Sequence, residues 1–362
     1  MYLVFILGKL KLAFYVLFLL TVSSSIYASS SNNVNTKTSN FSIGWYAPSN
    51  SVSHTTSLHQ KKIDIWTLEH LNNINFTKEL PEKYSPVYAK AQVLLARHHA
   101  SPGGVDGQLN LNTIKAISAF QIMNGLQGNG VLNEQTWRKL NETKQPAFIE
   151  YKITASDISG PYLDKIPLDY LEQSKLQALS YTRVTEMLAE RFQMDELFLQ
   201  KINPYTKFNR IGETILVANK VENSPKEIKY LVAYKTIKQL YAFDKNNKII
   251  ASFPATIGSE DNPSPSGTHT IANIVKNPYY SYSPKNFVQG NNLKPLTLAP
   301  GPNNPVGNIW IGLSKPSFGI HGTPSPSLIS KSASHGCIRL TNWDASALAR
   351  TLIKGTQVRF ID

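Results

Sequence analysis

The sequence predicts a multidomain chain in which a small three-helix module and an α+β module precede a mostly β domain with one short helix. Three changes of pattern along the chain support this prediction. Apolar residues recur at helical spacing between 85 and 140, two short helical patterns and an apolar strand follow between 184 and 217, and apolar and polar residues alternate from 229 onward. A chain of 362 residues is long enough to hold two or three such units.

The first 28 residues have the three regions of a secretory signal. Lysines precede a short apolar run from Leu10 to Val22, and small residues follow it. No cysteine comes next, which excludes a lipoprotein anchor. Because Ile26 stands where processing favours a small residue, an uncleaved membrane anchor or a buried N-terminal helix stays an alternative. We predict a signal peptide over 1–28, a flexible Ser/Thr/Asn-rich leader over 29–62, and export to the periplasm or cell wall.

The chain carries a formal net charge of +13, from 37 Lys and Arg against 24 Asp and Glu. Residues 229–362 hold most of this excess, with 14 basic against 5 acidic residues. Such a surface favours anionic partners, which include nucleic acid, an anionic membrane and an anionic wall polymer. The lysines are scattered singly, which argues against nucleic acid. We expect membrane contact only through the N-terminal segment, if it stays uncleaved.

Residues 63–145 are predicted to form the three-helix module. Helical spacing marks a first helix around Val87–Leu95, a second around Thr113–Phe120 and a short third around Trp137–Leu140, with glycine turns between them. Thirteen positions carry a further pattern: Gln92, Asp106, Gly107, Thr113, Ala116, Ile117, Phe120, Gln121, Gly125, Leu126, Gly130, Thr136 and Trp137. That pattern resembles the peptidoglycan-binding three-helix domain, which implies wall binding. The same residues also suffice to build a small core, so no ligand contact is inferred.

Residues 146–225 are predicted to form the α+β module. Helical spacing runs from Val184 to Phe192 and again from Leu197 to Ile202, and Ile215–Val217 reads as a strand. Asn203-Pro204 and Gly212 stand between the second helix and the strand. This order resembles a degenerate LysM-type glycan-binding module. A plain structural linker domain is the alternative.

Residues 226–362 are predicted to form the mostly β domain. The segment 229–258 is expected to be a hairpin of two strands around the turn at Asp244–Asn247, and further strands are expected at 266–275, 308–313 and 356–361. A single helix over 344–354, with Asp344 as its N-cap, precedes the last strand. The loops between the strands are long and rich in Pro, Asn and Gly, as functional loops often are.

Cys337 is the only cysteine of the chain and lies in the stretch SASHGCIRL. One cysteine cannot form an internal disulfide, and an unpaired thiol in an oxidising compartment is a liability unless it is buried or used. A nucleophilic thiol needs a nearby base, for which histidine is the natural residue. His335 is too close along the chain for its side chain to meet Cys337 readily. His321, one loop away in GIHGT, is therefore the better candidate base.

No Asp or Glu occurs between Asp261 and Asp344. A group that orients His321 must then be a main-chain carbonyl, an amide or hydroxyl side chain, or a residue distant in sequence. The same absence disfavours zinc, because the histidines of a catalytic zinc site need carboxylates or carbonyls that accept hydrogen bonds from their rings. The paired ligand spacings usual for zinc sites are also missing. We expect no metal and no cofactor.

The stretches HGT and SHGCIRL, with GPNNPVGNIWIGL upstream, closely resemble the signature of the YkuD-type L,D-transpeptidase catalytic domain over 229–362. The resemblance implies a YkuD-like β-sandwich with one short helix. It implies Cys337 as nucleophile and His321 as proton donor and acceptor, with the main-chain carbonyl of Gly322 orienting that histidine.

Four further residues gain candidate roles from the same resemblance. His335 and Gly336 shape the site, and main-chain N–H groups of Gly336 and Cys337 stabilise the oxyanion. Arg339, beside the nucleophile, is a candidate for binding a substrate carboxylate. Ser334 is a candidate hydrogen-bonding and substrate-binding residue of the site loop.

The implied reaction is a two-step acyl transfer on peptidoglycan stem peptides. The Cys337 thiolate attacks the carbonyl that joins the L-centre of a diaminopimelate-type residue to the terminal D-Ala of a tetrapeptide stem, and D-Ala leaves. A neighbouring stem amine then gives a 3→3 crosslink, a lysine-bearing wall protein becomes anchored, or water makes the enzyme an L,D-carboxypeptidase. A non-catalytic wall-binding protein and a cysteine peptidase or amidase are the alternative functions.

Overall fold

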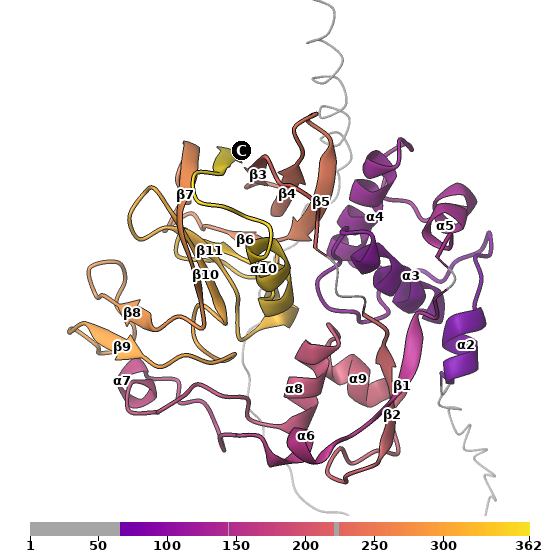
Figure 1. The fold of residues 1–362 in the computed structure, drawn as a ribbon, viewed down its shortest axis with the longest axis horizontal. Coiled ribbons are helices and arrows are strands. Elements are labelled where there is room, and N and C mark those ends of the chain that lie inside the picture. Colours follow the sequence, from indigo (N-terminus) through magenta and orange to yellow (C-terminus); the bar gives the residue numbers. More distant parts are fainter. Residues whose placement is uncertain (1–65, 144, 221–223) are drawn as a thin grey trace, which may run out of the picture. The chain divides into compact units, whose positions relative to one another are not determined.

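The computed structural model describes residues 66–143, 145–220 and 224–362 (Figure 1). These belong to one compact unit that spans Lys62–Asp362. The predicted signal peptide and leader lie outside the described residues. Within the described ranges, no helix combines the length and the apolar character needed to cross a bilayer.

The three predicted helices of the first module are present, and one short helix precedes them. Each begins at a polar N-cap whose side chain accepts a main-chain N–H, as Ser85 and Asn110 do for the two longest. Gln92 accepts from the N–H groups of Asp106 and Gly107, and Gln121 accepts from Gly130. Much of the predicted motif thus closes the turns of the fold. The helices are α2 (Leu68–Asn73), α3 (Pro86–Arg97), α4 (Leu111–Met123) and α5 (Glu134–Leu140).

The middle segment pairs two strands and packs helices against them. The two predicted helices and the predicted strand are present, and the side chain of Asn203 exchanges two hydrogen bonds with the main chain of Leu216. The sequence did not indicate the partner strand or the two short helices before α8. The likeness to a LysM module stays a prediction. The elements are β1 (Phe148–Lys152), α6 (Ala155–Ser159), α7 (Tyr170–Gln173), α8 (Val184–Arg191), α9 (Glu196–Ile202) and β2 (Thr214–Ala218).

The last segment is mostly β, as predicted. Its main sheet has nine strands in the order β5-β4-β3-β13-β7-β10-β11-β12-β6. The ten-residue strand β7 pairs with β13 through its first half and with β10 through its second half, so it belongs to both halves of the sheet. The strands at the two ends, β5 and β6, are separated by Ala255 alone, so the sheet nearly closes into a barrel.

The strands of this segment are β3 (Tyr230–Tyr234), β4 (Gln239–Phe243), β5 (Ile249–Pro254), β6 (Thr256–Ile257), β7 (Gly267–Lys276), β8 (Tyr280–Tyr282), β9 (Leu296–Leu298), β10 (Ile309–Leu313), β11 (Gly319–His321), β12 (Ile338–Arg339) and β13 (Gln357–Ile361). Its helices are the 3₁₀ turn η1 (Pro326–Leu328) and α10 (Asn342–Ala349). The core lies between the two halves of the sheet and α10, and it holds Leu231, Ile311, Ile320, Ile338 and Leu348.

Two predicted details of this segment are wrong. The predicted turn at Asp244–Asn247 is present between β4 and β5, but the stretch 229–243 is itself a hairpin, because the chain turns at Lys235–Lys238 with Lys238 at φ +52°. The segment to 258 therefore holds more than two strands. The helix begins at Asn342 and not at Asp344, because the hydroxyl of Thr341 accepts the N–H of Asp344 and acts as the cap. It also ends at Ala349, five residues before the predicted end.

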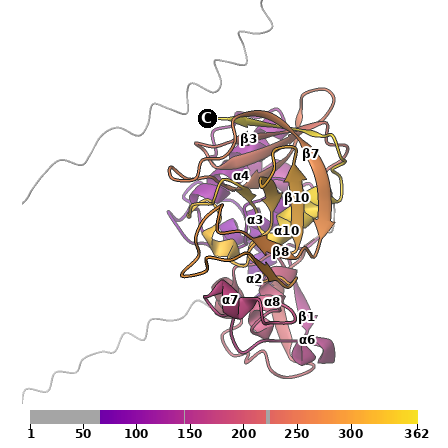
Figure 2. The same cartoon turned by 90° about the vertical axis from the view of Figure 1, so that its left-hand side faces the viewer.

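The three segments contact one another through the main chain. Ser101 donates its N–H to Ser252 of β5 at 2.9 Å, and Ser252 donates to His99 at 2.8 Å. Asp195 donates its main-chain N–H to the main-chain oxygen of Val105 at 2.9 Å, and this bond joins the first module to the middle segment. In both Figure 1 and Figure 2, α7 lies beside the β8–β9 pair. The middle segment therefore contacts the mostly β segment at α7, and its helix α8 also contacts α10.

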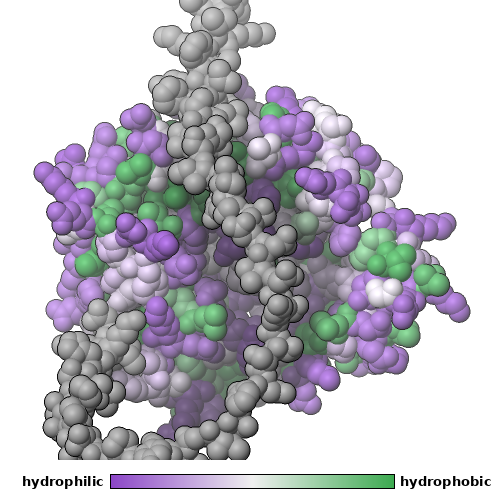
Figure 3. Space-filling model, turned by 180° about the vertical axis from the view of Figure 1, so that it is seen from behind, coloured by the Kyte–Doolittle hydropathy of each residue, from purple (hydrophilic) through white to green (hydrophobic). Residues whose placement is uncertain are grey.

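The surface mixes polar and apolar side chains. On the face opposite to Figure 1, hydrophilic side chains alternate with small apolar patches (Figure 3). Such scattered apolar residues are normal on a folded protein, because polar surface cannot cover it completely.

Candidate active site

Two short parallel strands bring the predicted catalytic residues together. β11 and β12 pair with Ile320 opposite Ile338 and His321 opposite Arg339. Ile320 and Ile338 are both fully buried in the core. Because alternate side chains of a strand point to opposite faces, His321, Arg339 and Cys337 share the other face. The alternation in GIH and CIR is therefore what places the thiol and the imidazole on the same face of the sheet, with Arg339 directly opposite His321.

His321 is held in one orientation. Its Nδ1 lies 2.6 Å from the main-chain oxygen of Gly322, and its ring stacks on Trp310 with centroids 5.8 Å apart. A carbonyl can only accept, so Nδ1 carries the proton and Nε2 is the basic nitrogen. Burial, with a contribution from the charge of Arg339, lowers the pKa of His321 to about 3. The imidazole is therefore neutral at physiological pH.

Cys337 is a partly exposed thiol at the start of β12. Its Sγ lies 3.7 Å from the main-chain oxygen of Ser317. Burial by the surrounding atoms raises the pKa of the Cys337 thiol, while a hydrogen bond from the main chain of Gly319 and the charge of Arg339 act in the opposite direction. The residue before it, Gly336, has φ +91°, a conformation that favours glycine.

Ser334 supports the loop that carries the thiol. Its hydroxyl donates to the main-chain oxygen of Cys337 and accepts from the N–H of Gly258, both at 2.7 Å. Its side chain is buried, so these two contacts fix the loop. Its predicted substrate contact stays a prediction.

His335 lies away from the base. It is exposed, and its ring stacks on Phe287 with centroids 4.0 Å apart. Phe287 packs in turn in a small apolar cluster with Tyr170 of α7 and Tyr282 of β8. His335 thus joins the loop before Cys337 to the segment between β8 and β9.

Arg339 is a half-buried side chain that contacts the loop before the thiol. Burial lowers the pKa of Arg339, and Tyr170, Cys337 and Tyr280 oppose that shift. One guanidinium nitrogen donates to the main-chain oxygen of Ala333 at 3.4 Å, while Nε is buried with no hydrogen-bond partner among the described residues. The terminal nitrogens carry more N–H groups than this one bond uses, so they keep donor capacity for an anionic group.

Two residues of this site gave no sequence signal. Tyr170 comes from the middle segment, more than a hundred residues before the thiol. Asn342, 1% exposed at the start of α10, accepts the N–H groups of Thr323 at 3.1 Å and Asn308 at 3.3 Å. Only the fold brings these residues to His321 and Arg339.

Across the part of the chain that the structure describes, no group of three His, Cys, Asp or Glu side chains is arranged to hold a metal ion. The Tyr280 ring packs on that of Tyr170 with centroids 5.9 Å apart, Tyr282 is buried in the same apolar cluster, and Tyr279 is exposed. Trp310 is half-buried, and its ring stacks on that of His321.

Comparisons with known proteins identify this arrangement. The family model of the L,D-transpeptidase catalytic domain (YkuD) matches residues 228–360, and the model described as "Putative peptidoglycan binding domain" matches residues 86–140. The Bacillus subtilis protein named "Putative L,D-transpeptidase YqjB" is 30% identical over 138 residues, which cover 37% of this chain and 71% of that one. The chain belongs to the L,D-transpeptidase family.

Other relatives extend this similarity. The Bacillus licheniformis "Putative L,D-transpeptidase YkuD" is 27% identical over 175 residues, covering 48% of this chain and 90% of that one. The crystal structure of L,D-transpeptidase 3 from Mycobacterium tuberculosis matches 42% of this chain and 76% of that one at 13% identity, with a TM-score of 0.31. This L,D-transpeptidase is an enzyme of the cell wall, with peptidoglycan as its substrate.

Proposed function

We propose that this L,D-transpeptidase is exported and that it uses Cys337 as its nucleophile. The observation that carries the proposal is the β11–β12 pairing, which places the only cysteine of the chain on the same face as a buried, oriented histidine. In the first step Sγ attacks the carbonyl between a diaminopimelate-type L-centre and the terminal D-Ala of a tetrapeptide stem. The C–N bond breaks, D-Ala leaves with a proton on its amine, and a thioester remains.

His321 moves the proton in this scheme. Because the pKa of His321 is lowered and that of Cys337 is raised, the resting pair is a neutral imidazole and a thiol. Nε2 then takes the proton as Sγ attacks, and returns it to the departing amine. The carbonyl of Gly322 keeps Nδ1 protonated throughout, which leaves Nε2 available for both transfers.

The remaining groups are proposed to bind the donor stem and to stabilise the tetrahedral intermediate. The main-chain N–H groups of Gly336 and Cys337 are proposed to stabilise the oxyanion of the tetrahedral intermediate. Arg339, through the further N–H groups of its terminal nitrogens, is proposed to bind a carboxylate of the donor stem. The acceptor is proposed to be the amine of a neighbouring stem, which gives a 3→3 crosslink. A lysine of a wall-anchored protein is the other amine acceptor, and water would give a carboxypeptidase.

The test uses the chain from about residue 29 onward with disaccharide tetrapeptides, followed by mass spectrometry. We expect a dimer that has lost one D-Ala with the wild type and no product with Cys337→Ala. Tripeptide monomer without dimer would instead support the carboxypeptidase, and an active Cys337→Ala variant would remove the cysteine mechanism.

A second measurement isolates the base. Alkylation of Cys337 by iodoacetamide near neutral pH is expected to slow in His321→Ala and to keep its wild-type rate in His269→Ala. His269 is a matched control because it lies on β7 of the same sheet with its own main-chain contact, to Ser266. Equal rates in the wild type and His321→Ala would exclude His321 as the base.

A further inference from the structure

One amide side chain fixes the backbone on which His321 depends. Asn342 Oδ1 accepts the N–H of Thr323, the residue after the carbonyl that orients the imidazole. The contact is close, since a Cβ built on Gly322 would lie 2.1 Å from the same oxygen. A shift of Asn342 would therefore displace the Gly322–Thr323 peptide and, with it, the acceptor of Nδ1.

The orientation of that amide is set from its other end. Asn342 Nδ2 donates to Glu190 Oε2 at 2.8 Å and to the main-chain oxygen of Pro302 at 3.1 Å. If the amide flipped, its NH₂ group would face two N–H donors and its oxygen would face two acceptors. The acceptors around Nδ2 thus keep Oδ1 directed at Thr323.

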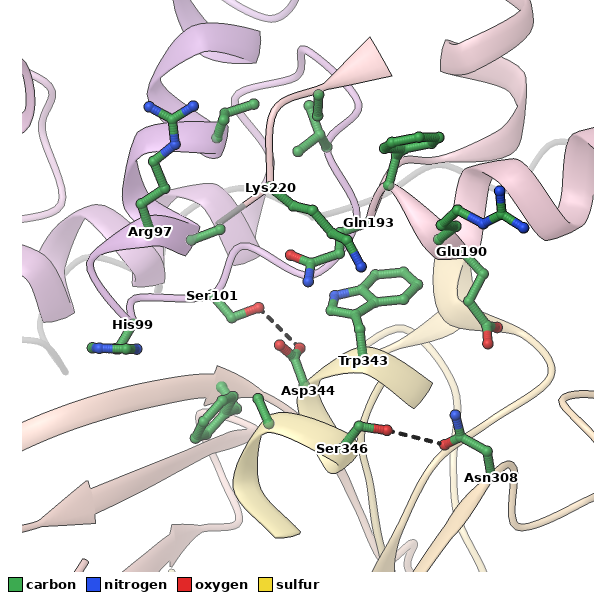
Figure 4. Close-up of a pocket in the computed structure, with 18 of the residues that line it drawn as sticks. Arg97, His99, Ser101, Glu190, Gln193, Lys220, Asn308, Trp343, Asp344 and Ser346 are labelled. Carbon is green, nitrogen blue, oxygen red and sulfur yellow. Dashed lines mark hydrogen bonds between the residues drawn. The ribbon is translucent and has the colours of Figure 1, made fainter. Parts of the chain in front are cut away.

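Glu190 comes from outside the segment that matches the catalytic family. It lies on α8 of the middle segment, and its other oxygen accepts the hydroxyl of Tyr181 at 2.9 Å. Glu190 lines a cavity of about 370 Å³, and Trp343 and Asp344 of α10 line it from another element (Figure 4). The cavity lining includes neither His321 nor Cys337, and the hydrogen bonds of the Glu190 carboxylate go to Tyr181 and Asn342.

We propose that Glu190 is a positioning residue for the transpeptidase reaction, which acts through Asn342 on the peptide that orients His321. This inference rests on the proposed role of His321 as the base. The consequence is that the middle segment completes the catalytic site, besides linking it to the peptidoglycan-binding helices.

Two substitutions, Glu190→Met and Glu190→Gln, test whether Glu190 acts through the hydrogen bond that it accepts from Asn342. Methionine has a similar length but no acceptor for Asn342. Glutamine keeps one oxygen for Asn342, while its NH₂ group can donate to the Tyr181 hydroxyl, which also accepts. Ser101→Ala is the matched control. It also removes a hydrogen bond that reaches α10 from outside the β segment, the 2.9 Å bond from Ser101 to Asp344, but this bond does not involve Asn342.

The experiment measures kcat and KM on disaccharide tetrapeptide and the alkylation rate of Cys337 between pH 5 and 9, with the full chain from residue 29. We expect Glu190→Met to lower kcat about tenfold with KM within about twofold of the wild type, since small misplacements of a catalytic group cost this much. Glu190→Gln and Ser101→Ala should stay within about twofold. The pH profile of alkylation in Glu190→Met should approach that of His321→Ala.

The double variant Glu190→Met/His321→Ala decides between positioning and a general loss of structure. If Glu190 acts through His321, the double variant alkylates no more slowly than His321→Ala alone. A further slowing, a wild-type kcat in Glu190→Met, or an equal loss in Ser101→Ala would overturn the inference. If Glu190→Met does not fold, Glu190→Asp, one methylene too short to reach Asn342, gives the same comparison. Failure of the proposed function is distinct, because His321→Ala itself would then behave as the wild type.

Discussion

Replacing Asp344 by asparagine is expected to stabilise the protein at alkaline pH. Asp344 is the third residue of α10, 5% exposed, and its carboxylate accepts the hydroxyl of Ser101 at 2.9 Å. Burial, opposed by the hydrogen bonds from Ser101 and Thr341, raises the pKa of Asp344 from 3.8 to about 7. The site therefore favours a neutral group, and asparagine is neutral at every pH while keeping an oxygen for Ser101.

The magnitude follows from the shift in pKa. Between about pH 4 and pH 7 the folded state holds a proton that the unfolded state has released, so the free energy of unfolding falls as the pH rises. A shift of about 3 pKa units corresponds to a loss of at most about 4 kcal/mol at pH 8, relative to pH 4. Asparagine does not titrate, so Asp344→Asn should lack this loss.

The assay is urea unfolding of the wild type, Asp344→Asn and the exposed control Asp164→Asn from pH 4.5 to 8. We expect Asp344→Asn to match the wild type near pH 4.5 and to gain about 2–4 kcal/mol over it at pH 8. Part of the dependence should remain in Asp344→Asn, because burial also raises the pKa of Glu190 to about 7. A difference between the two proteins that stays constant with pH would refute the reasoning.

Two further predictions concern β12 and the residue before Cys337. Arg339→Lys should raise KM for a tetrapeptide donor about tenfold with little change in the alkylation rate of Cys337, because lysine keeps the charge but not the planar donor array. Steady-state kinetics and Cys337 alkylation, measured on the same variant, check this prediction. An unchanged KM would show that Arg339 does not bind the donor. Gly336→Ala should lower the free energy of unfolding by about 1–2 kcal/mol and slow acylation of Cys337. The reason is that Gly336 has φ +91° and that a Cβ at this position would lie 2.7 Å from the Phe318 ring. A fully active variant with wild-type stability would contradict both expectations.

The fold was predictable where the pattern is local. Apolar spacing in α3, α4, α8 and α9 predicts helices that are present, and alternation predicts β7, β10 and β13. The turn at Lys235–Lys238 was missed because KTIK contains none of the Gly, Asn, Asp or Pro residues that mark tight turns. The start of α10 was misplaced because Thr341 and Asp344 are both good cap residues, and only the structure shows which side chain bonds to the main chain.

The candidate site was predictable only in part, for a physical reason. His321 and Cys337 could be paired from chemistry, since a thiol needs a base and a neighbouring residue rarely reaches it. Tyr170, Glu190 and Asn342 have no local pattern, because each depends on a contact between segments more than a hundred residues apart. Asp344 was expected at a helix terminus, whereas its burial against Ser101 depends on packing between the first module and α10.

The main-chain contacts of Ser252 with His99 and Ser101 have a consequence for where on the wall the reaction takes place. They attach the loop after α3 directly to a strand of the catalytic sheet, with no free linker between them. If the helices bind a glycan strand, the thiol stays at a fixed distance from that strand. Stems that project at that spacing would then be modified in preference to others, so the interval between successive crosslinks would be a property of the enzyme as well as of the wall.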